Sequence, residues 1–314
     1  MAEVYDAIII GGGPAGLTAA IYGERAGMKC LLLAGHGAGG QLLLTTDVDD
    51  YPGFPDGIKG PDLMTMWRKQ AERFCKDIIN EDATEVDFGK RPFTVEAGNN
   101  IYKGRTVIIA TGASPKMLGI SSEGEYLGKG VSTCATCDGF FFKDKDVVVV
   151  GGGDTAMREA IFLANICKTV TVIHRRDKLR AQKALQSIAM SKKNMKWIWD
   201  SAVEGFYGDK LLKGVRIKNV KTGKVADMPV SGAFVAIGHA PNTSLFEGKI
   251  EMEKGHIILR SLPSVQTSVP GVFAAGDVHD YIYMQAVTAA ADGCKAALEA
   301  QRFLEEEKSG KAGN

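Results

Sequence analysis

The sequence predicts an α/β protein built from two similar domains, with the second inserted into the first. One order of elements, an apolar strand followed by a glycine-rich turn and a helical stretch, occurs twice, and so does a short apolar strand that ends in Gly-x-x-Pro. Near its end the chain forms one more buried strand and a long helix. Self-similarity of this kind indicates two copies of one architecture.

The first copy opens with the apolar run 7–10, which leads into glycines and then into an alanine-rich helical stretch. The second copy opens in the same way after the valines at 147–150. We therefore expect each turn between a strand and the helix after it. The turn residues are Gly11, Gly12, Gly13, Pro14, Ala15 and Gly16 in the first copy and Gly151, Gly152, Gly153, Asp154 and Thr155 in the second.

Each copy closes with a short apolar strand, at 109–115 in the first and at 235–241 in the second. Strands of one parallel sheet end at the same edge, so these exits are expected beside the glycine turns. The exit residues assigned to the binding sites are Ala110, Thr111 and Gly112 in the first copy and Ile237 and Gly238 in the second.

The two copies are not expected to lie end to end. A buried strand at 267–277 comes after the second exit, and a helical pattern begins at residue 285. In the simplest arrangement this tail completes the first copy. We therefore expect a first domain of residues 1–114 and 246–314 and a second domain of residues 115–245.

Charge and composition exclude several classes of protein. The chain has 314 residues with 38 Lys and Arg against 37 Asp and Glu, a net charge of +1, which argues against a nucleic-acid or membrane-surface partner. The longest uncharged run, Ala7 to Gly23, is too short for a membrane span and is interrupted by glycines. Glu3 and Asp6 precede it, so no secretory leader is expected and the predicted location is cytoplasmic.

The context of the glycine turns indicates which ligand they bind. Glycine lets the backbone turn tightly and approach a pyrophosphate, whose charge rests on the free N–H groups of the helix N-terminus. Two such turns, each between an apolar strand and a helix, indicate two bound dinucleotides. The predicted fold class is therefore α/β with two Rossmann-like dinucleotide-binding domains.

The residues after the second strand of each copy differ. In the second copy His174, Arg175, Arg176 and Arg180 come after the strand, and arginine there favours the 2′-phosphate of NADP over the ribose hydroxyl of NAD. In the first copy the corresponding strand ends at 31–35 with neither an acid nor an arginine. The contacts of the first nucleotide's adenosine ribose are left open.

Cys134 and Cys137 form a Cys-x-x-Cys. A zinc site needs two more Cys or His ligands at matching spacing, and none is nearby, so a redox-active dithiol is favoured over zinc or a structural accident. The spacing lets the second thiol resolve a mixed disulfide. Asp138 comes directly after the pair; like charge would raise the pKa of a thiol, so we interpret it as a proton shuttle, with a simple turn residue as the alternative.

These motifs, in this order, resemble those of the small thioredoxin reductases of prokaryotes, a group of FAD- and NADPH-dependent pyridine nucleotide-disulfide oxidoreductases. The resemblance covers essentially the whole chain. The motifs that carry it are Gly11-Gly-Gly-Pro-Ala-Gly16, Gly39-Gly-Gln-Leu42, Cys134-Ala-Thr-Cys-Asp138, His174-Arg-Arg-Asp-x-x-Arg180, Ile237-Gly-His-x-Pro-Asn-Thr243 and Ala275-Gly-Asp-Val278.

The resemblance implies FAD in the first domain, NADPH in the second, a homodimer, and thioredoxin as the substrate. It places Gly40 and Gln41 in the FAD site and Asp277 against the flavin ribityl chain. It places Gln285 and Ala286 at a helix N-terminus beside the flavin pyrimidine. No metal is implied.

Two positions depart from the family pattern. The usual acidic pair in the helix of the second turn is Arg158 and Glu159 here, which adds positive charge beside a pyrophosphate. The arginine expected before Gln285 is Met284, which removes a cation near the contact between flavin and nicotinamide. Both changes bear on the choice of reductant.

The predicted function is reduction of thioredoxin by NADPH, through hydride transfer to FAD and dithiol–disulfide exchange at Cys134 and Cys137. The enzymatic alternatives are a reductase of another thioredoxin-like or peroxiredoxin-system protein and a ferredoxin-fed flavin disulfide reductase. The arginine cluster argues against ferredoxin. The non-enzymatic alternative is a flavin-based redox sensor.

The sequence also predicts a rotation. The cysteine pair lies before the strand 147–150 and the second glycine turn lies after it, yet both redox groups must reach one flavin. The two crossings between domains, near 111–116 and 238–246, both contain Gly and Pro, and a paired crossing can serve as a hinge.

Overall fold

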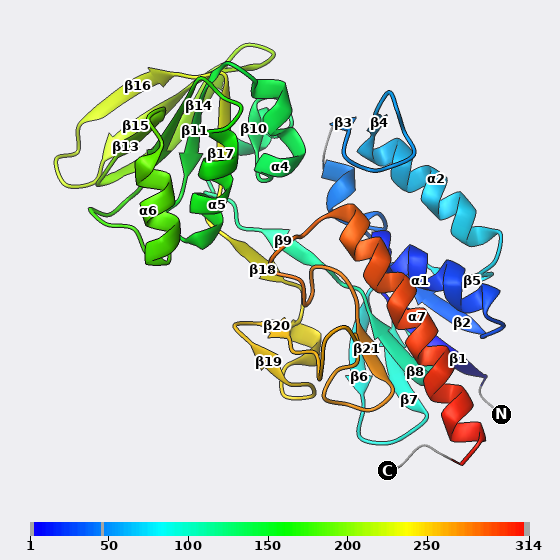
Figure 1. Cartoon of the computed structure of the whole chain (residues 1–314). Helices are drawn as coiled ribbons and strands as arrows, with labels where there is room; N and C mark the ends of the chain where they lie inside the picture. Colours follow the sequence, from blue (N-terminus) through cyan, green and yellow to red (C-terminus); the bar gives the residue numbers. More distant parts are fainter. Residues whose placement is uncertain (1–2, 45–46, 311–314) are drawn as a thin grey trace. The chain divides into compact units, whose positions relative to one another are not determined.

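The computed structural model describes residues 3–44 and 47–310 and divides the chain into two compact units (Figure 1). Unit 1 comprises the chain up to Ser114 and from Ala240 onward, and unit 2 is Pro115–His239. The extreme ends of the expected first domain, at 1–2 and 311–314, lie outside the described residues. The α/β class and the insertion of one unit into the other agree with the prediction.

The main sheet of unit 1 has the order β5-β2-β1-β8-β7-β6, with β21 also paired to β8, and β3-β4 and β19-β20 form two separate two-stranded sheets. Its strands are β1 (Val4–Ile10), β2 (Cys30–Leu33), β3 (Asp47–Val48), β4 (Ile58–Lys59), β5 (Asp77–Ile79), β6 (Ala83–Asp87), β7 (Phe93–Ala97), β8 (Asn100–Ile109), β19 (Met252–Glu253), β20 (His256–Ile257) and β21 (Val272–Ala274). Its helices are α1 (Pro14–Arg25), η1 (Gly40–Leu44), α2 (Gly60–Glu72), η3 (Ser244–Phe246) and α7 (Ala286–Lys308).

The central strands of unit 1 are apolar where both of their faces are buried, at 7–10 on β1, along all of β2 and at 107–109 on β8. Along β1, Ile9 packs into the core that lies against α1, α2 and α7, whereas Ile8 packs into the core on the opposite face, and both are fully buried. α1 and α7 approach closely, since a Cβ built on Gly293 would stand 2.1 Å from the carbonyl oxygen of Ala15. This contact draws the beginning of α1 toward the last helix of the unit.

Unit 2 contains a parallel sheet in the order β10-β17-β11-β12-β13 and an antiparallel sheet in the order β14-β15-β16 (Figure 1). Its strands are β10 (Val131–Ser132), β11 (Asp146–Val150), β12 (Thr169–Ile173), β13 (Met195–Ile198), β14 (Ser201–Gly208), β15 (Leu212–Asn219), β16 (Val225–Pro229) and β17 (Gly232–Val235). Its helices are α3 (Glu123–Tyr126), α4 (Ala135–Asp138), η2 (Gly139–Phe142), α5 (Asp154–Leu163) and α6 (Lys183–Ser191). Among the described residues of either unit, no helix is long and apolar enough to cross a bilayer.

Two short strands connect the units. β9 (Ala113–Pro115) and β18 (His239–Pro241) pair with each other in a two-stranded sheet. The return to unit 1 therefore falls at 239–240, six residues before the boundary expected at 245–246. The residues in between belong to unit 1, because the hydroxyl of Thr243 donates to the carbonyl of Gly255 at 2.7 Å and Phe246 is fully buried in the unit 1 core.

Candidate active site

The two glycine turns are built alike. Gly11 has φ +118° and Gly151 has φ +152°, conformations that side chains rarely adopt. A Cβ on Gly11 would stand 2.2 Å from the carbonyl oxygen of Ala110, and a Cβ on Gly151 would stand 2.4 Å from that of Ala236. Each turn therefore touches the exit strand of its own unit, as the sequence predicts, and tolerates only glycine there.

The opposite side of each turn is open. A Cβ built on Gly13 or Gly153 would meet no atom within 4 Å. These residues are the N-caps of α1 and α5, and neither makes a side-chain capping hydrogen bond. The N–H groups of the first turn of each helix, which in α1 begin at Ala15 because Pro14 has none, are therefore available to an anion, and the bare glycines leave room for its approach. Both turns fit the pyrophosphate of a dinucleotide.

The remaining residues assigned to FAD all belong to unit 1. Gly40 lies in η1, and a Cβ on it would stand 3.6 Å from the Cα of Gly13. Gln285 is the N-cap of α7, where its side chain and Thr288 form a capping box. The others lie just after the carboxyl ends of β8 and β21 or beside the residues just named: Gln41, Ala110, Thr111, Gly112, Gly276, Asp277 and Ala286. Strand ends, η1 and a helix N-terminus thus all contribute to this set.

Asp277 lies just after β21. Burial raises the pKa of its carboxyl to about 7, and the charges of Asp280 and Asp292 raise it further while His279 opposes them. The Nε2 atom of His279 lies 2.9 Å from Asp292, whose other oxygen accepts from Lys295 at 2.9 Å. Near neutral pH the Asp277 carboxyl can therefore donate as well as accept a hydrogen bond.

The loop before α7 is held by one carboxylate. Asp280 accepts the backbone N–H groups of Ile282 and Tyr283 at 2.9 Å and that of Met284 at 3.3 Å. Met284 has φ +51°, a left-handed conformation that costs free energy for a residue with a side chain. The departure from the family pattern therefore lies at the tightest point of this loop.

In unit 2 the residues after β12 fold back onto the glycine turn. The backbone N–H groups of Arg180 and Ala181 both donate to the carbonyl of Gly152, at 2.7 and 3.2 Å. Asp154, predicted to touch the cofactor, accepts the N–H of Gln182 at 2.7 Å and so holds this segment. In the sequence, the only sign of this hydrogen bond is the acid Asp154 at the first position of the helix.

The arginines of this segment are exposed, whereas its histidine is buried. Arg175, Arg176 and Arg180 are exposed, and no ion pair of their guanidinium groups occurs within the part of the chain that the structure describes. His174, expected to contact the cofactor, is buried under the turn, where a Cβ on Gly152 would stand 2.4 Å from its ring. Burial lowers the pKa of His174, and the charges of the three arginines lower it further, so its ring is mainly neutral. Its contact with the cofactor stays a prediction.

Cys134 and Cys137 form a disulfide on α4. Ser132 Oγ accepts the N–H of Cys134 at 3.0 Å, and the N–H of Cys137 donates to the Sγ of Cys134 at 3.2 Å. Gly139 seats this segment on α5, since a Cβ there would stand 2.9 Å from Leu163. Both cysteines are thus held at the start and within a short helix of unit 2, and both are half-buried.

Phe140 and Phe141 come after the disulfide and are 68% and 40% exposed, whereas Phe142 packs edge-on against Phe234 in the core. No role for Phe140 and Phe141 is predicted from the sequence. The signal was three consecutive phenylalanines, of which a buried core position explains only one. An exposed aromatic pair beside a reactive disulfide suits contact with a protein.

The two residues that stand in place of the usual acidic pair on α5 have different surroundings. Arg158 is exposed. Glu159 turns inward, burial raises its pKa to about 8, and its Oε2 atom has no hydrogen-bond partner among the described residues. At neutral pH Glu159 is therefore mainly protonated, and the net change of the pair is an added surface cation.

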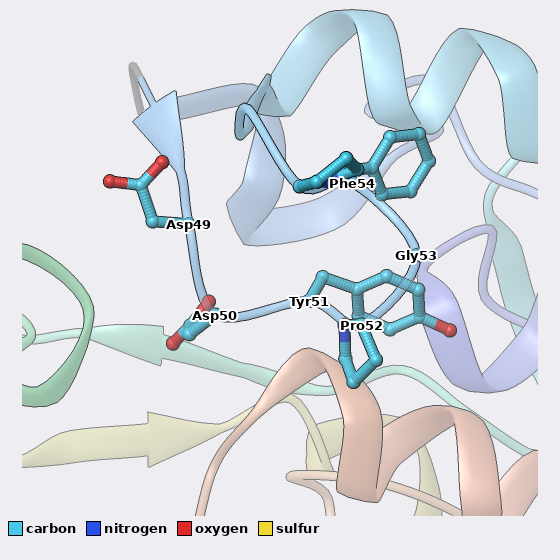
Figure 2. Close-up of a pocket in the computed structure, with 7 residues that line it drawn as sticks. Asp49, Asp50, Tyr51, Pro52, Gly53 and Phe54 are labelled. Carbon is cyan, nitrogen blue, oxygen red and sulfur yellow. The ribbon is translucent and has the colours of Figure 1, made fainter.

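A hollow that the sequence analysis also missed lies in unit 1 along the loop after β3. It has a volume of about 500 Å³ and is lined by Asp49, Asp50, Tyr51, Pro52, Gly53, Phe54 and Pro55. Figure 2 shows the two carboxylates at one end of this loop and the rings of Tyr51 and Phe54 at the other. The Tyr51 ring is anchored 5.0 Å from that of Trp67. Two prolines and a glycine within seven residues were the available signal.

No group of three or more potential metal ligands occurs within residues 3–44 and 47–310.

The model of the pyridine nucleotide-disulphide oxidoreductase family matches residues 5–293. The chain is similar to a thioredoxin reductase of Rickettsia conorii, at 50% identity over 95% of this chain and 97% of that protein.

Two solved structures extend this comparison. Thioredoxin reductase from Giardia duodenalis is 43% identical, with a TM-score of 0.93, and the match covers 96% of this chain and 99% of that one. Lactococcus lactis thioredoxin reductase in its FR conformation is 39% identical with the same coverage of both chains, yet its TM-score is 0.62. Similar sequences in this group thus superpose on the whole chain to very different degrees.

Proposed function

Because the chain belongs to the pyridine nucleotide-disulphide oxidoreductase family, we propose that it is a thioredoxin reductase that takes electrons from NADPH through FAD. The observation that carries this proposal is the Cys134–Cys137 disulfide in the unit that also holds a glycine turn and three exposed arginines. The names of the relatives favour it over a ferredoxin-fed reductase and a flavin sensor.

Unit 1 is proposed to hold FAD. The N–H groups at the start of α1 face the open side of Gly13 and suit the pyrophosphate. Asp277 offers a half-neutral carboxyl to the ribityl hydroxyls, and the N-terminus of α7 at Gln285 and Ala286 presents N–H groups to an electron-rich ring. When bound, FAD supplies the two-electron transfer that links a nicotinamide to a disulfide.

Unit 2 is proposed to hold NADPH. The turn at Gly153 and the start of α5 bind the pyrophosphate, and Arg175, Arg176 and Arg180 bind the 2′-phosphate. The carbonyl of Gly152 fixes the arginine segment beside the turn through two backbone N–H groups. Nucleotide binding is thus assigned to the glycine turn, and the choice of NADPH is assigned to the arginine segment beside it.

The reduced pair passes its electrons to thioredoxin by exchange. We assign the attack to Cys134, because the N–H of Cys137 already donates to its sulfur and would stabilise a thiolate there. The thiolate of Cys134 attacks one sulfur of the partner disulfide and releases the other as a thiol. Cys137 then attacks Cys134, which re-forms the disulfide and releases the second thiol of the partner. Asp138 carries the protons in this proposal, and Phe140 and Phe141 contact the partner.

The position of the disulfide supports the proposed rotation. The disulfide segment packs near Leu163, at the end of α5, whereas the nucleotide turn precedes Asp154, at its beginning. At about 1.5 Å per residue these points are roughly 13 Å apart along the helix. The paired linkers β9 and β18 form the hinge in this proposal. The unequal TM-scores of the Giardia and Lactococcus proteins, at similar identity, support more than one arrangement in the family.

A cytoplasmic location and a homodimer are part of the proposal. Cys30, Cys75, Cys167 and Cys294 are free thiols, which fits a reducing compartment. The dimer is taken from the family resemblance, and light scattering of the purified protein tests it.

The direct test is an assay of the purified flavoprotein with NADPH or NADH and thioredoxin, in which the absorbance of the reduced nicotinamide is followed. We expect rapid oxidation of NADPH that depends on thioredoxin, and slower oxidation of NADH. Bound flavin with no turnover would favour the sensor instead, and reduction by ferredoxin alone would favour the ferredoxin-fed enzyme.

A further inference from the structure

The sequence of unit 1 lacks an acid where its nucleotide fold normally has one. In a dinucleotide-binding unit, a carboxylate at the end of the second strand accepts a hydrogen bond from the ribose 2′-hydroxyl. The residues after β2 are Ala34, Gly35 and His36, none of which is acidic. The structure shows which group occupies this position.

A carboxylate arrives from another part of the chain. β5 pairs with β2 in parallel, with Leu33 opposite Ile79, and the N–H of Ala34 donates to the carbonyl of Ile79 at 2.8 Å. The chain after β5 therefore continues beside the chain after β2 and brings Asp82 to its end. The N–H of His36 donates to Asp82 Oδ1 at 3.2 Å, and its Nδ1 lies 2.9 Å from Oδ2.

This carboxylate lies at the same edge as the first glycine turn. A Cβ on Gly12 would stand 2.7 Å from the carbonyl oxygen of Ala34, so the turn touches the first residue after β2. A Cβ on Gly35, which has φ +78°, would stand 2.6 Å from Asp82 Oδ1. Ala34, which contacts the glycine turn, and Gly35, which contacts Asp82, are thus adjacent residues.

The pair has the chemistry that a ribose needs. The hydrogen bond from the His36 side chain holds the pKa of Asp82 below its ordinary value, so the carboxyl is ionised at neutral pH. A carboxylate accepts about four hydrogen bonds, and His36 occupies only two of these positions. The Asp82 side chain is 66% exposed, so the remaining lone pairs face solvent and can accept from two ribose hydroxyls.

We propose that Asp82, oriented by His36, binds the adenosine ribose of the nucleotide in unit 1 and excludes a nucleotide that carries a 2′-phosphate there. The second part holds because a carboxylate repels the phosphate that the arginines of unit 2 attract. This inference rests on the proposed function in that it takes the nucleotide to be FAD.

The test uses full-length apoprotein titrated with FAD and with the FAD analogue whose adenosine lacks the 2′-hydroxyl, with quenching of flavin fluorescence as the readout. The wild-type protein is expected to bind the analogue about tenfold more weakly than FAD, since the lost bond is charge-assisted. Asp82→Ala is expected to bind FAD about tenfold more weakly and to bind the two ligands equally well.

The matched control is Glu85→Gln, which removes the same charge from an exposed position on β6 and leaves the ribose contact in place. Asp82→Asn, which keeps the shape of the side chain, provides the second variant if Asp82→Ala does not give the wild-type circular dichroism spectrum. An Asp82 variant that loses affinity for both ligands but still discriminates between them would reduce the residue to a loop contact and overturn the inference. Wild-type affinity in these variants would also overturn it, whereas a protein that binds no FAD refutes the proposed function itself.

Discussion

The two units have glycine turns of the same kind, which suit a pyrophosphate, and they differ in the residues after the second strand. In unit 1, β2 leads into glycine and histidine, and Asp82 reaches its end from the segment after β5. In unit 2, β12 leads into a buried histidine and three exposed arginines. In the proposed function, the turn therefore sets the class of ligand, and the residues after the second strand select between a free and a phosphorylated ribose.

The units also differ in their chemistry. Unit 2 has a second redox group, the disulfide on α4, whereas the cysteines of unit 1 within the described ranges are free thiols. Burial raises the pKa of Cys75 to about 12 and that of Cys30 well above its ordinary value, which keeps both unreactive. The proposed function therefore assigns the thiol exchange to unit 2 and nucleotide binding to both units.

The largest expected effect comes from removing the disulfide, the group that distinguishes unit 2 from unit 1. Cys134→Ser or Cys137→Ser should abolish reduction of thioredoxin while NADPH still bleaches the flavin, because the dithiol acts only after the flavin is reduced. Stopped-flow absorbance of the flavin and steady-state oxidation of NADPH measure the two parts separately.

Cys167→Ser is the matched control, since Cys167 is a buried free thiol of the same unit. Its activity should stay near that of the wild-type protein. If either disulfide variant still reduced thioredoxin at the wild-type rate, the pair would be a bystander.

A smaller effect is expected at the arginines. Arg175→Ala with Arg176→Ala should weaken NADPH binding by about tenfold or more and leave NADH nearly unchanged, since each charge-assisted contact is worth roughly 1.5–3 kcal/mol. The ratio of kcat/KM for the two reductants reports the change. Lys193→Ala with Lys196→Ala removes the same charge from unit 2 at positions outside the arginine segment and should leave the ratio as it is. Equal losses with both reductants would contradict the assignment.

The smallest effect concerns the pH dependence of the stability of unit 1. The pKa of Asp277 is raised from 3.8 to about 7, so between these values the folded protein binds a proton that the unfolded chain has released. This contribution to stability is present at low pH and is lost as the pH rises through about 7. Asp277→Asn removes it.

Urea unfolding of the apoprotein over this pH range measures the effect. The midpoint of the wild-type protein should fall relative to that of Asp277→Asn as the pH rises, and parallel curves would show that Asp277 does not titrate in this window. His279, Asp280 and Asp292 surround position 277 in both proteins, so the comparison isolates the carboxyl of Asp277.

The sequence predicted the strand, turn and helix of each unit because those elements are fixed by local patterns. Gly11 and Gly151 stand between an apolar strand and a helix, and the structure places both in turns with positive φ. The burial of His174 could not be predicted from its ligand-like neighbours in sequence, because it depends on the packing of the glycine turn against its ring. Asp82 could not be found from sequence, since only the parallel pairing of β2 with β5 brings it to the end of another strand.

The position of β21 has a consequence for the order in which the protein is made. β8 pairs with β7 along its first half and with β21 along Val107–Ile109, and α1 packs against α7. The ribosome therefore releases nearly the whole chain before unit 1 can close its sheet and cover it with its last helix. Unit 2 is continuous in sequence and can finish folding first, whereas the sheet of unit 1 stays incomplete during synthesis until residues beyond 272 emerge.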